Sequence, residues 1–154
     1  MSKSSPPQPK IRNKKAVKRY EILDRIECGL VLTGTEVKSL RQARASLDEA
    51  FARITDGEVW LFGCHIATYD HGNVQNHEPL RRRKLLLHRR EIARLGPKVF
   101  QKGLTLVPLD IYFSERGLAK VTLALVRGKS HHDKRQDLKK RDDRREMDRA
   151  LRRR

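Results

Sequence analysis

The stretch AFARITDGEVWLFGCHI, residues 50–66, indicates the fold class of this chain. Two apolar runs, residues 50–54 and 58–66, flank the dipeptide Asp56-Gly57. Asp-Gly readily takes the positive φ angles that a two-residue hairpin turn requires, and between apolar runs it is the strongest short hairpin signal. The stretch therefore predicts two antiparallel strands joined by a tight turn.

The segments on both sides of this hairpin extend the β pattern. Residues 20–32 alternate between apolar and polar or small side chains and predict a strand, with Gly29 at a bulge or bend. Residues 104–112 and 119–126 predict two last strands, joined by the turn SERG. Such short strands favour a small antiparallel closed barrel with helices packed on it, although periodicity alone does not identify which barrel.

Two helices are predicted between these strands. Residues 36–45 form a short helix with Thr35 as the N-cap and Glu36 at its positive end. Residues 81–95, RRRKLLLHRREIARL, read as an amphipathic helix that ends before Gly96-Pro97. The whole chain then divides into a flexible basic arm at residues 1–12, a barrel domain at 13–127 and a basic tail at 128–154.

The charge of the chain narrows its partners. The 154 residues carry a formal net charge of +17, which favours nucleic acid first and an anionic membrane second. No apolar run is long enough for a membrane span, and the N-terminus does not resemble a secretory signal. Cys28 and Cys64 lack CxxC spacing and are expected to be reduced thiols, as in a cytoplasmic protein.

The tail has the composition of a segment that folds on a partner. Residues 128–154 hold twelve basic and six acidic side chains, a net charge of +6, and only four apolar ones. This composition predicts disorder in the free protein, yet the absence of Gly and Pro after Gly128 favours a helix on a polyanion. On such a helix Met147, Ala150 and Leu151 form one small apolar patch, without the continuous stripe of a membrane helix.

Candidate chemistry is otherwise sparse. The run Arg81–Lys84 is expected to contact phosphate, the alternative being a solvated helix face. Most aromatic side chains are expected in the core, which favours recognition of RNA shape and backbone over base sequence. His65, His71 and His77 lack the spacing of a zinc site, so no metal or cofactor is expected. No catalytic motif is visible, and the chain is expected not to be an enzyme.

Several stretches together resemble one family. They run in order along the chain: Asn13-Lys14-Lys15 with Tyr20, Glu27-Cys28-Gly29-Leu30, GTEVKSLR at 34–41, RRRKLLL at 81–87, Gly117–Val121, and Gly128-Lys129 followed by His132–Arg135. These motifs resemble the SmpB family, the SsrA-binding proteins of bacterial trans-translation. Cys28 stands where the family usually has alanine, and Ser130 where a second lysine is common.

The resemblance implies a fold, partners and a function. The fold is an oligonucleotide-binding-type barrel that grips the tRNA-like domain of transfer-messenger RNA near its elbow, one protein to each RNA, in place of the missing anticodon arm. The complex enters stalled ribosomes, where the tail becomes helical in the empty mRNA channel by the decoding centre. The alternatives are a general basic RNA-binding or ribosome-associated protein and a metal-dependent nuclease.

The resemblance also implies particular residues. The RNA-binding residues are Asn13, Lys14, Lys15, Tyr20, Glu27, Lys38, Arg41, Lys84, Leu86, Lys120, Arg127 and Lys129. Leu86 could equally belong to a helix core. The tail residues that act on the ribosome are Gly128, His132, Asp133, Lys134, Arg135, Met147 and Leu151.

Overall fold

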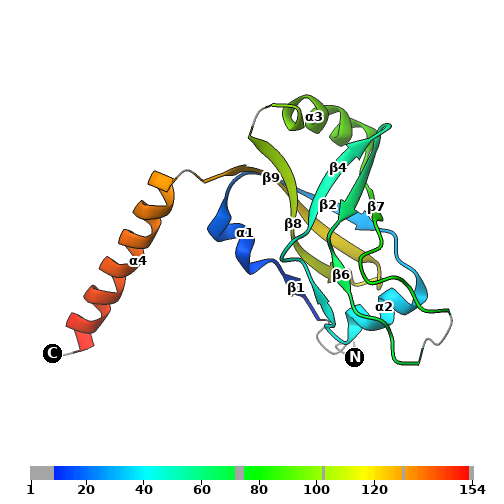
Figure 1. Ribbon diagram of the computed structural model, residues 1–154, viewed down its shortest axis with the longest axis horizontal. Helices are drawn as coiled ribbons and strands as arrows, with labels where there is room; N and C mark the ends of the chain where they lie inside the picture. The colour runs from blue at the N-terminus through cyan, green and yellow to red at the C-terminus, as the bar shows by residue number, and fades with distance from the viewer. Residues whose placement is uncertain (1–8, 72–74, 102, 130, 153–154) are drawn as a thin grey trace, which may run out of the picture.

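The computed structural model describes residues 9–71, 75–101, 103–129 and 131–152, and the side chains of 131–137 are not described. This part of the chain is mainly β with four helices (Figure 1). The helices are α1 (Lys14–Arg19), α2 (Gly34–Arg41), α3 (Arg89–Val99) and α4 (His131–Arg152). The strands are β1 (Ile11–Arg12), β2 (Tyr20–Leu30), β3 (Ala45–Ser46), β4 (Phe51–Thr55), β5 (Glu58–Phe62), β6 (His65–Ile66), β7 (Arg83–Leu86), β8 (Leu104–Phe113) and β9 (Ala119–Gly128).

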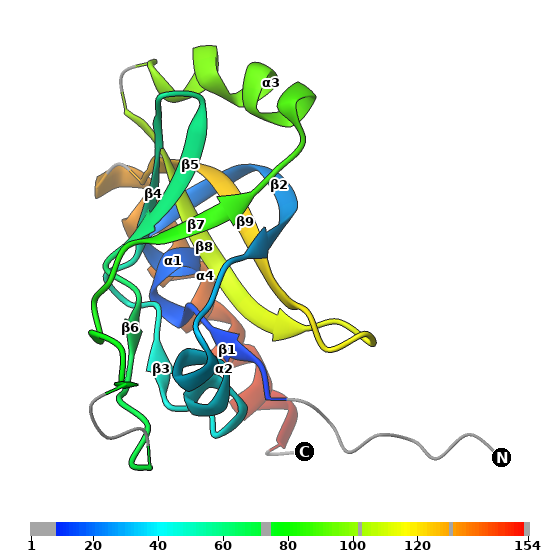
Figure 2. The same ribbon diagram turned by 90° about the vertical axis from the view of Figure 1, so that its right-hand side faces the viewer.

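One antiparallel sheet organises the molecule. Its seven strands follow the order β1-β8-β4-β5-β7-β2-β9, and β8 also pairs with β9. The strands curve around a common interior, as Figure 2 shows, and β3 and β6 form a separate two-stranded sheet. The interior is filled by aliphatic side chains of many elements, including Ile26, Leu40, Leu47, Val59, Leu61, Ile66, Leu85, Leu95, Leu106, Ile111, Val121 and Leu123.

The hairpin at Asp56-Gly57 is confirmed. Strands β4 and β5 pair in register from Phe51 opposite Phe62 to Thr55 opposite Glu58. Asp56 and Gly57 both have positive φ angles, 52° and 75°, as a turn of this hand requires. The second strand is shorter than predicted because Gly63, at φ 70°, turns the chain; a Cβ there would lie 2.4 Å from the carbonyl oxygen of Glu49.

The helix predicted over residues 81–95 is wrong in its first half. Residues Arg83–Leu86 form strand β7, which pairs with β5 and β2, and helix α3 begins only at Arg89. Arg, Lys and Leu are good helix formers, so propensity alone pointed to a helix. Burial instead alternates with the period of a strand, because Arg83 and Leu85 face the interior. Helix α3 also continues through Gly96-Pro97 to Val99.

Two smaller predictions also change. Helix α2 begins at Gly34 with Thr33 as its N-cap, not Thr35, and the backbone N–H of Thr33 donates to Glu36 at 2.8 Å. The irregularity in β2 lies between Ile22 and Asp24 and not at Gly29. Gly29 is needed for another reason: a Cβ there would lie 3.2 Å from Cβ of Leu86, so glycine permits the close approach of β7.

Both ends of the sheet reach beyond the predicted domain. Ile11 and Arg12, assigned to the flexible arm, pair with β8, and residues 1–8 of that arm lie outside the described residues. At the other end β9 continues to Gly128, and the N–H of Lys129 donates to the carbonyl of Arg19 at 3.0 Å. The tail then forms α4, which stands apart from the sheet (Figure 1). Disorder of the tail in the free protein stays a prediction.

No helix within the described ranges is long and apolar enough to cross a membrane.

Candidate nucleic-acid interface

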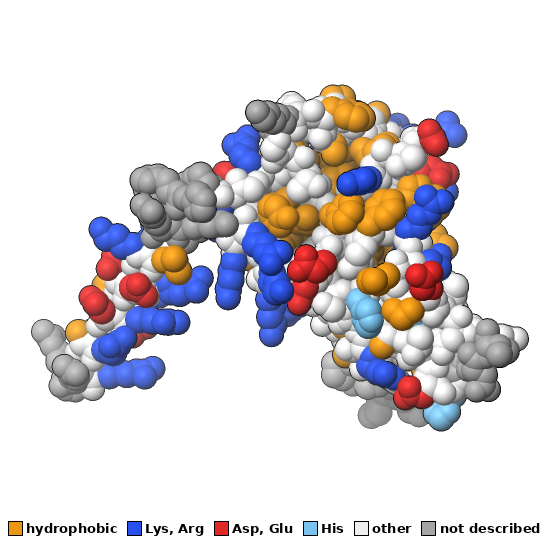
Figure 3. Space-filling model, viewed as in Figure 1, with side chains coloured by type: hydrophobic (Ala, Val, Ile, Leu, Met, Phe, Trp, Pro, Cys, Tyr) orange, Lys and Arg blue, Asp and Glu red, His pale blue; other side chains and the backbone are white. Residues whose placement is uncertain are grey.

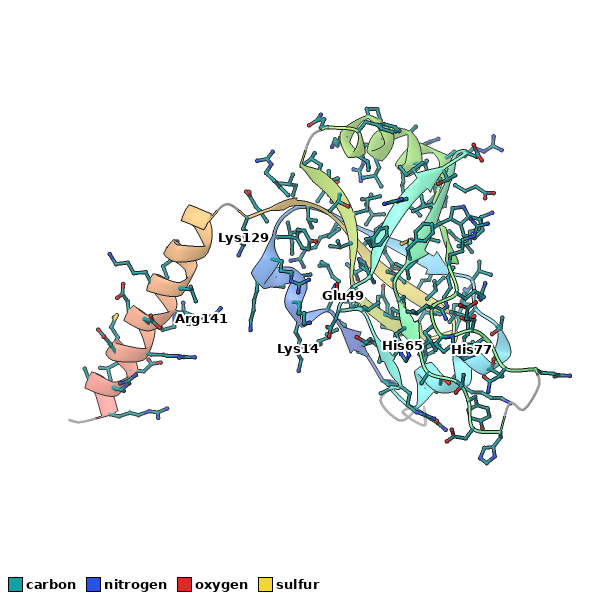
Figure 4. The ribbon with its side chains drawn as sticks, in the orientation of Figure 1. Lys14, Glu49, His65, His77, Lys129 and Arg141 are labelled. Atoms are coloured by element: carbon teal, nitrogen blue, oxygen red, sulfur yellow. The ribbon has the colours of Figure 1, made fainter. Side chains whose placement is uncertain are left out.

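The first cationic cluster lies where the chain enters and leaves the sheet. Lys14 and Lys15 are exposed on α1, and Tyr20 opens β2 directly after this helix. The register of β2 and β9 places Tyr20 opposite Gly128 and Glu21 opposite Arg127. Lys14 and Lys129 both lie on the side of the molecule from which α4 departs (Figure 4). Residues that are more than a hundred positions apart thus share one end of the sheet.

Asn13 supports this cluster from inside. Its side chain is buried, donates to the carbonyl of Pro108 at 2.9 Å and accepts from the N–H of Ala16 at 3.2 Å. The first of these bonds holds the chain to β8, and the second caps α1. Asn13 therefore orients the lysines of α1 by internal hydrogen bonds.

Carboxylates already accompany some of these cations. Lys15 lies 3.8 Å from Asp48 and 4.0 Å from Glu49, and Arg19 lies 3.9 Å from Glu49. All four side chains are about half exposed or more, so these long ion pairs are weak. Phosphate oxygens can replace such partners at small cost.

A second cluster occupies the outer face of β2, β8 and β9. Glu27 is exposed on β2, and Leu86 and Lys120 lie on either side of Gly29 through the pairings of β7 and β9. Leu86 is 53% exposed, so it does not belong to the core, which was the alternative assignment. Its apolar surface is available for a partner.

Tyr112 belongs to this second cluster, although sequence reasoning missed it. Its hydroxyl donates to the Glu27 carboxylate, and the register places it opposite Lys120. Burial and this hydrogen bond raise the pKa of Tyr112, so the hydroxyl stays protonated at neutral pH. Glu27 is thereby oriented as an acceptor, ready for a base amino group or a 2′-hydroxyl. No clear signal for Tyr112 was present in the sequence, because its strand β8 has three consecutive buried residues, Leu106 to Pro108, and so does not alternate simply.

The third group lies on helix α2. The ammonium of Lys38 lies 5.2 Å from the ring centroid of Tyr69, and the guanidinium of Arg41 lies 4.8 Å from that of Phe113. Both cations rest on aromatic rings, which holds long side chains in defined positions. Tyr69 was not among the predicted site residues, and it is half-buried outside the helices and strands.

The basic run Arg81–Lys84 is divided by the fold. Arg83 is completely buried and pairs with the buried carboxylate of Glu36, while also donating to the carbonyls of Cys64 and Pro79. Arg81 lies 2.5 Å from the same carboxylate. The prediction that the whole run contacts phosphate is therefore wrong, because the buried Arg83 cannot reach RNA. A charge buried this deeply needs its partner, and Glu36 supplies it.

Glu36 also makes stability depend on pH. Burial by itself raises the pKa of this carboxyl, but hydrogen bonds from Arg81, the N–H of Thr33 and Arg83 outweigh it and hold the pKa below its ordinary value of 4.5. A depressed folded-state pKa means that the unfolded chain binds the proton more readily. Its contribution to stability is thus complete above about pH 4.5 and is lost as pH falls through the folded pKa.

The variant Glu36→Gln should reveal this contribution. The difference in unfolding free energy between the natural protein and the variant should be largest near neutral pH. It should shrink as pH falls below about 4.5, because protonated Glu36 resembles the amide. Urea unfolding at a series of pH values from 7 to 3 measures it. A difference that does not change with pH would contradict the role of the ionised carboxylate.

The predicted tail residues are only partly described. Met147 and Leu151 are 66% and 69% exposed on α4, so within the described part of the chain their apolar patch is open to solvent. Gly128 is the last residue of β9. The side chains of His132, Asp133, Lys134 and Arg135 lie outside the described residues. Lys and Arg side chains cover much of α4 and of the part of the body that faces it (Figure 3).

The histidines and cysteines have structural surroundings. His77 is buried and bonds the hydroxyl of Thr35 at 2.8 Å and the carbonyl of Ile66 at 2.9 Å, while His65 is exposed on β6 (Figure 4). Cys28 and Cys64 are free and buried, and burial raises their pKa values to about 12 and about 11. Among the described residues, no group of three or more His, Cys, Asp or Glu side chains could hold a metal ion.

A small β protein with cationic clusters at one end of its sheet, on its outer face and along a protruding helix has the features of a basic nucleic-acid-binding protein. The model of one family, described as SmpB protein, matches residues 10–153. The chain belongs to the SmpB family.

Proteins called SsrA-binding protein are similar over nearly the whole chain. That of Rhodopirellula baltica is 53% identical over 145 residues, which cover 94% of this chain and 82% of that protein. That of Mycolicibacterium smegmatis is 58% identical over 142 residues, covering 92% and 88%. A chain in the solved structure "tmRNA-SmpB: a journey to the center of the bacterial ribosome" is 50% identical, with a TM-score of 0.69 over 84% of this chain and 94% of that chain.

Proposed function

We propose that this protein binds the tRNA-like domain of transfer-messenger RNA and delivers it to ribosomes that have stalled without mRNA in the A-site channel. Its close relatives are SsrA-binding proteins, and the similar solved chain comes from a tmRNA-SmpB structure. The protein acts by binding and needs no cofactor. Because it acts on ribosomes, the protein is expected in the cytoplasm.

One observation carries this proposal: the first cationic cluster and the start of the tail meet at a single junction. The hydrogen bond from the Lys129 N–H to the Arg19 carbonyl ties the start of the tail to the last residue of α1. A sheet that grips RNA at this end therefore projects α4 in a defined starting direction. The same few residues thus connect RNA binding by the sheet with the direction in which the tail leaves it.

The sheet is well suited to hold a folded RNA. The pairings lead from β8 through β4, β5, β7, β2 and β9 back to β8, which supports a closed barrel of the oligonucleotide-binding type. A closed barrel is a rigid support without free sheet edges. Asn13, Lys14, Lys15, Tyr20, Arg127 and Lys129 act at its end, whereas Glu27, Leu86, Lys120, Lys84, Lys38 and Arg41 act on its outer surface. Such a face reads phosphates, 2′-hydroxyls and shape.

The tail is the proposed sensor of a missing message. An empty mRNA channel is lined by phosphates, and residues 128–154 carry a net charge of +6 to bind there. When mRNA fills the channel, the tail is excluded. The four apolar side chains of the tail are too few to attach it to the body, so it stays available.

Sequencing the RNA that copurifies with the protein tests this function. The protein is isolated from cells under mild salt, and the bound RNA is compared with total RNA. We expect transfer-messenger RNA to be enriched far above tRNA, because the proposed partner of the sheet is the tRNA-like domain of that RNA and the similar solved chain comes from a tmRNA-SmpB structure. Enrichment in proportion to cellular abundance would instead support a general basic RNA-binding or ribosome-associated protein.

A further inference from the structure

Aromatic and cationic side chains alternate across the outer face of β4, β5 and β7. The register places Arg53 opposite Trp60 and Trp60 opposite Lys84, in a row that crosses three strands. The adjoining row has Phe51 opposite Phe62, with Arg82 just before the first residue of β7. Arg53, Trp60 and Lys84 face outward because neighbouring residues of their strands are buried. Phe51 is partly buried, because it packs against the cluster of Ala16, Val107, Ala124 and Val126. The aromatic–cation array is Phe51, Arg53, Trp60, Phe62, Arg82 and Lys84.

Direct contacts hold the array together. The guanidinium of Arg82 lies 4.7 Å from the ring centroid of Trp60, and that of Arg53 lies 5.1 Å from the ring centroid of Phe51. The rings of Phe51 and Phe62 stack with centroids 5.5 Å apart and an interplanar angle of 16°. Planar groups are thus layered along the surface and hold one another in place.

The array carries positive charge that the protein does not neutralise. Lys84 pairs with Glu58 at 2.9 Å, whereas neither Arg53 nor Arg82 makes an ion pair with a carboxylate anywhere in the described part of the chain. Both arginines are exposed, and Figure 3 shows hydrophobic and cationic side chains side by side on this face. Cations without a carboxylate partner attract phosphates, and the rings beside them offer stacking surface to bases, which together are what a single-stranded nucleic acid requires.

We propose that the aromatic–cation array binds unpaired RNA, with bases stacked on its planar side chains and phosphates paired with Arg53 and Arg82. Trp60 and Phe62 offer ring surface, and a guanidinium layered on a ring offers a second flat surface to a base. This inference goes beyond the proposed function, which concerns a folded tRNA-like domain. Of the six residues, only Lys84 is among those that the family resemblance implies.

The array contains its own spectroscopic probe, because Trp60 is the one tryptophan of the chain. Full-length protein is titrated with a ten-nucleotide oligouridylate, which has no tRNA-like fold, and with an abasic oligomer of the same length. Binding is followed by anisotropy of the labelled RNA and by the emission of Trp60. We expect the oligouridylate to bind about tenfold more tightly than the abasic oligomer and to quench Trp60.

Variants separate stacking from bulk charge. Trp60→Ala should abolish the difference between the two oligomers, whereas Trp60→Phe should keep most of it. Arg82→Ala should weaken both oligomers more than Arg116→Ala, which removes the same charge from an exposed turn outside the array. Thermal melting checks that each variant is folded.

Several outcomes would overturn the proposal. The array fails as an RNA surface if the oligouridylate binds without changing Trp60 emission, or if both oligomers bind equally. Equal losses in Arg82→Ala and Arg116→Ala would assign the binding to net charge. If Trp60 emission changes with the protein concentration and not with added RNA, this face is an interface between copies of the protein. None of these results bears on binding of transfer-messenger RNA, and failure of that binding leaves this test intact.

Discussion

A protein that ends at Lys129 is expected to bind transfer-messenger RNA with unchanged affinity and to lose ribosome rescue. The truncation removes α4 but keeps Gly128 paired with Tyr20 and the bond from Lys129 to Arg19, so the RNA-binding end of the sheet stays intact. Without the cationic tail, nothing occupies the empty mRNA channel. Gel-shift titration with transfer-messenger RNA measures the first property, and tagging of a peptide on a stalled ribosome measures the second.

Two further variants sharpen this test. A protein that ends at Arg127 also loses the junction, so it should bind RNA more weakly than the protein that ends at Lys129. A full-length variant with Met147→Ser and Leu151→Ser keeps every charge and removes only the apolar patch of α4. Its intermediate tagging would assign part of the tail's work to that patch. Loss of RNA affinity on ending at Lys129 would refute the separation of grip and probe.

The variant Glu36→Ala is expected to lower the free energy of unfolding by about 3–5 kcal/mol. It leaves the guanidinium of Arg83, which is fully buried, without a carboxylate. This loss is a large part of the roughly 5–15 kcal/mol that stabilises a small domain. Helix α2 and the chain leading into β7 should loosen together, because Arg81 loses the same partner. Denaturant unfolding monitored by circular dichroism measures the change.

An exposed ion pair provides the matched control. Glu58→Ala removes the partner of Lys84, whose side chain is 38% exposed, and should cost less than about 1 kcal/mol. The double variant Glu36→Leu with Arg83→Met should recover part of the loss, since an apolar pair leaves no buried charge. Recovery stays partial because the carbonyls of Cys64 and Pro79 lose their donor. Equal effects of Glu36→Ala and Glu58→Ala would show that burial does not matter here.

The cationic candidate residues were easier to predict from the sequence than the exposed aromatic ones. Lys14, Lys15, Arg127 and Lys129 were predicted as RNA-binding residues from their place in motifs that match the family, and this role stays a prediction. Tyr112 and Trp60 were not predicted, because an aromatic ring in a strand is assigned to the core until the direction of its side chain is known. Asn13 was predicted from its motif, and only the structure shows that its side chain is buried and bonds Pro108 and Ala16.

The features that were predicted correctly follow from local rules. The hairpin at Asp56-Gly57 follows from the φ angles of two residues, and the charge and helical propensity of the tail follow from its composition. Strands β8 and β9 were likewise predicted as two strands on either side of the turn SERG. Each of these features depends on neighbours in the chain, so no distant contact was needed to predict it.

That Arg83–Leu86 form a strand and not a helix could be seen only in the tertiary structure. Arg83 enters the interior as part of a strand because Glu36, 47 positions earlier, neutralises it there. The same strand sets Lys84 beside Trp60 and thereby completes the array on its outer face. A buried charge is stable only with its partner, and that partner comes from another element. No local pattern contains this information, because it arises from packing between segments that are far apart in the chain.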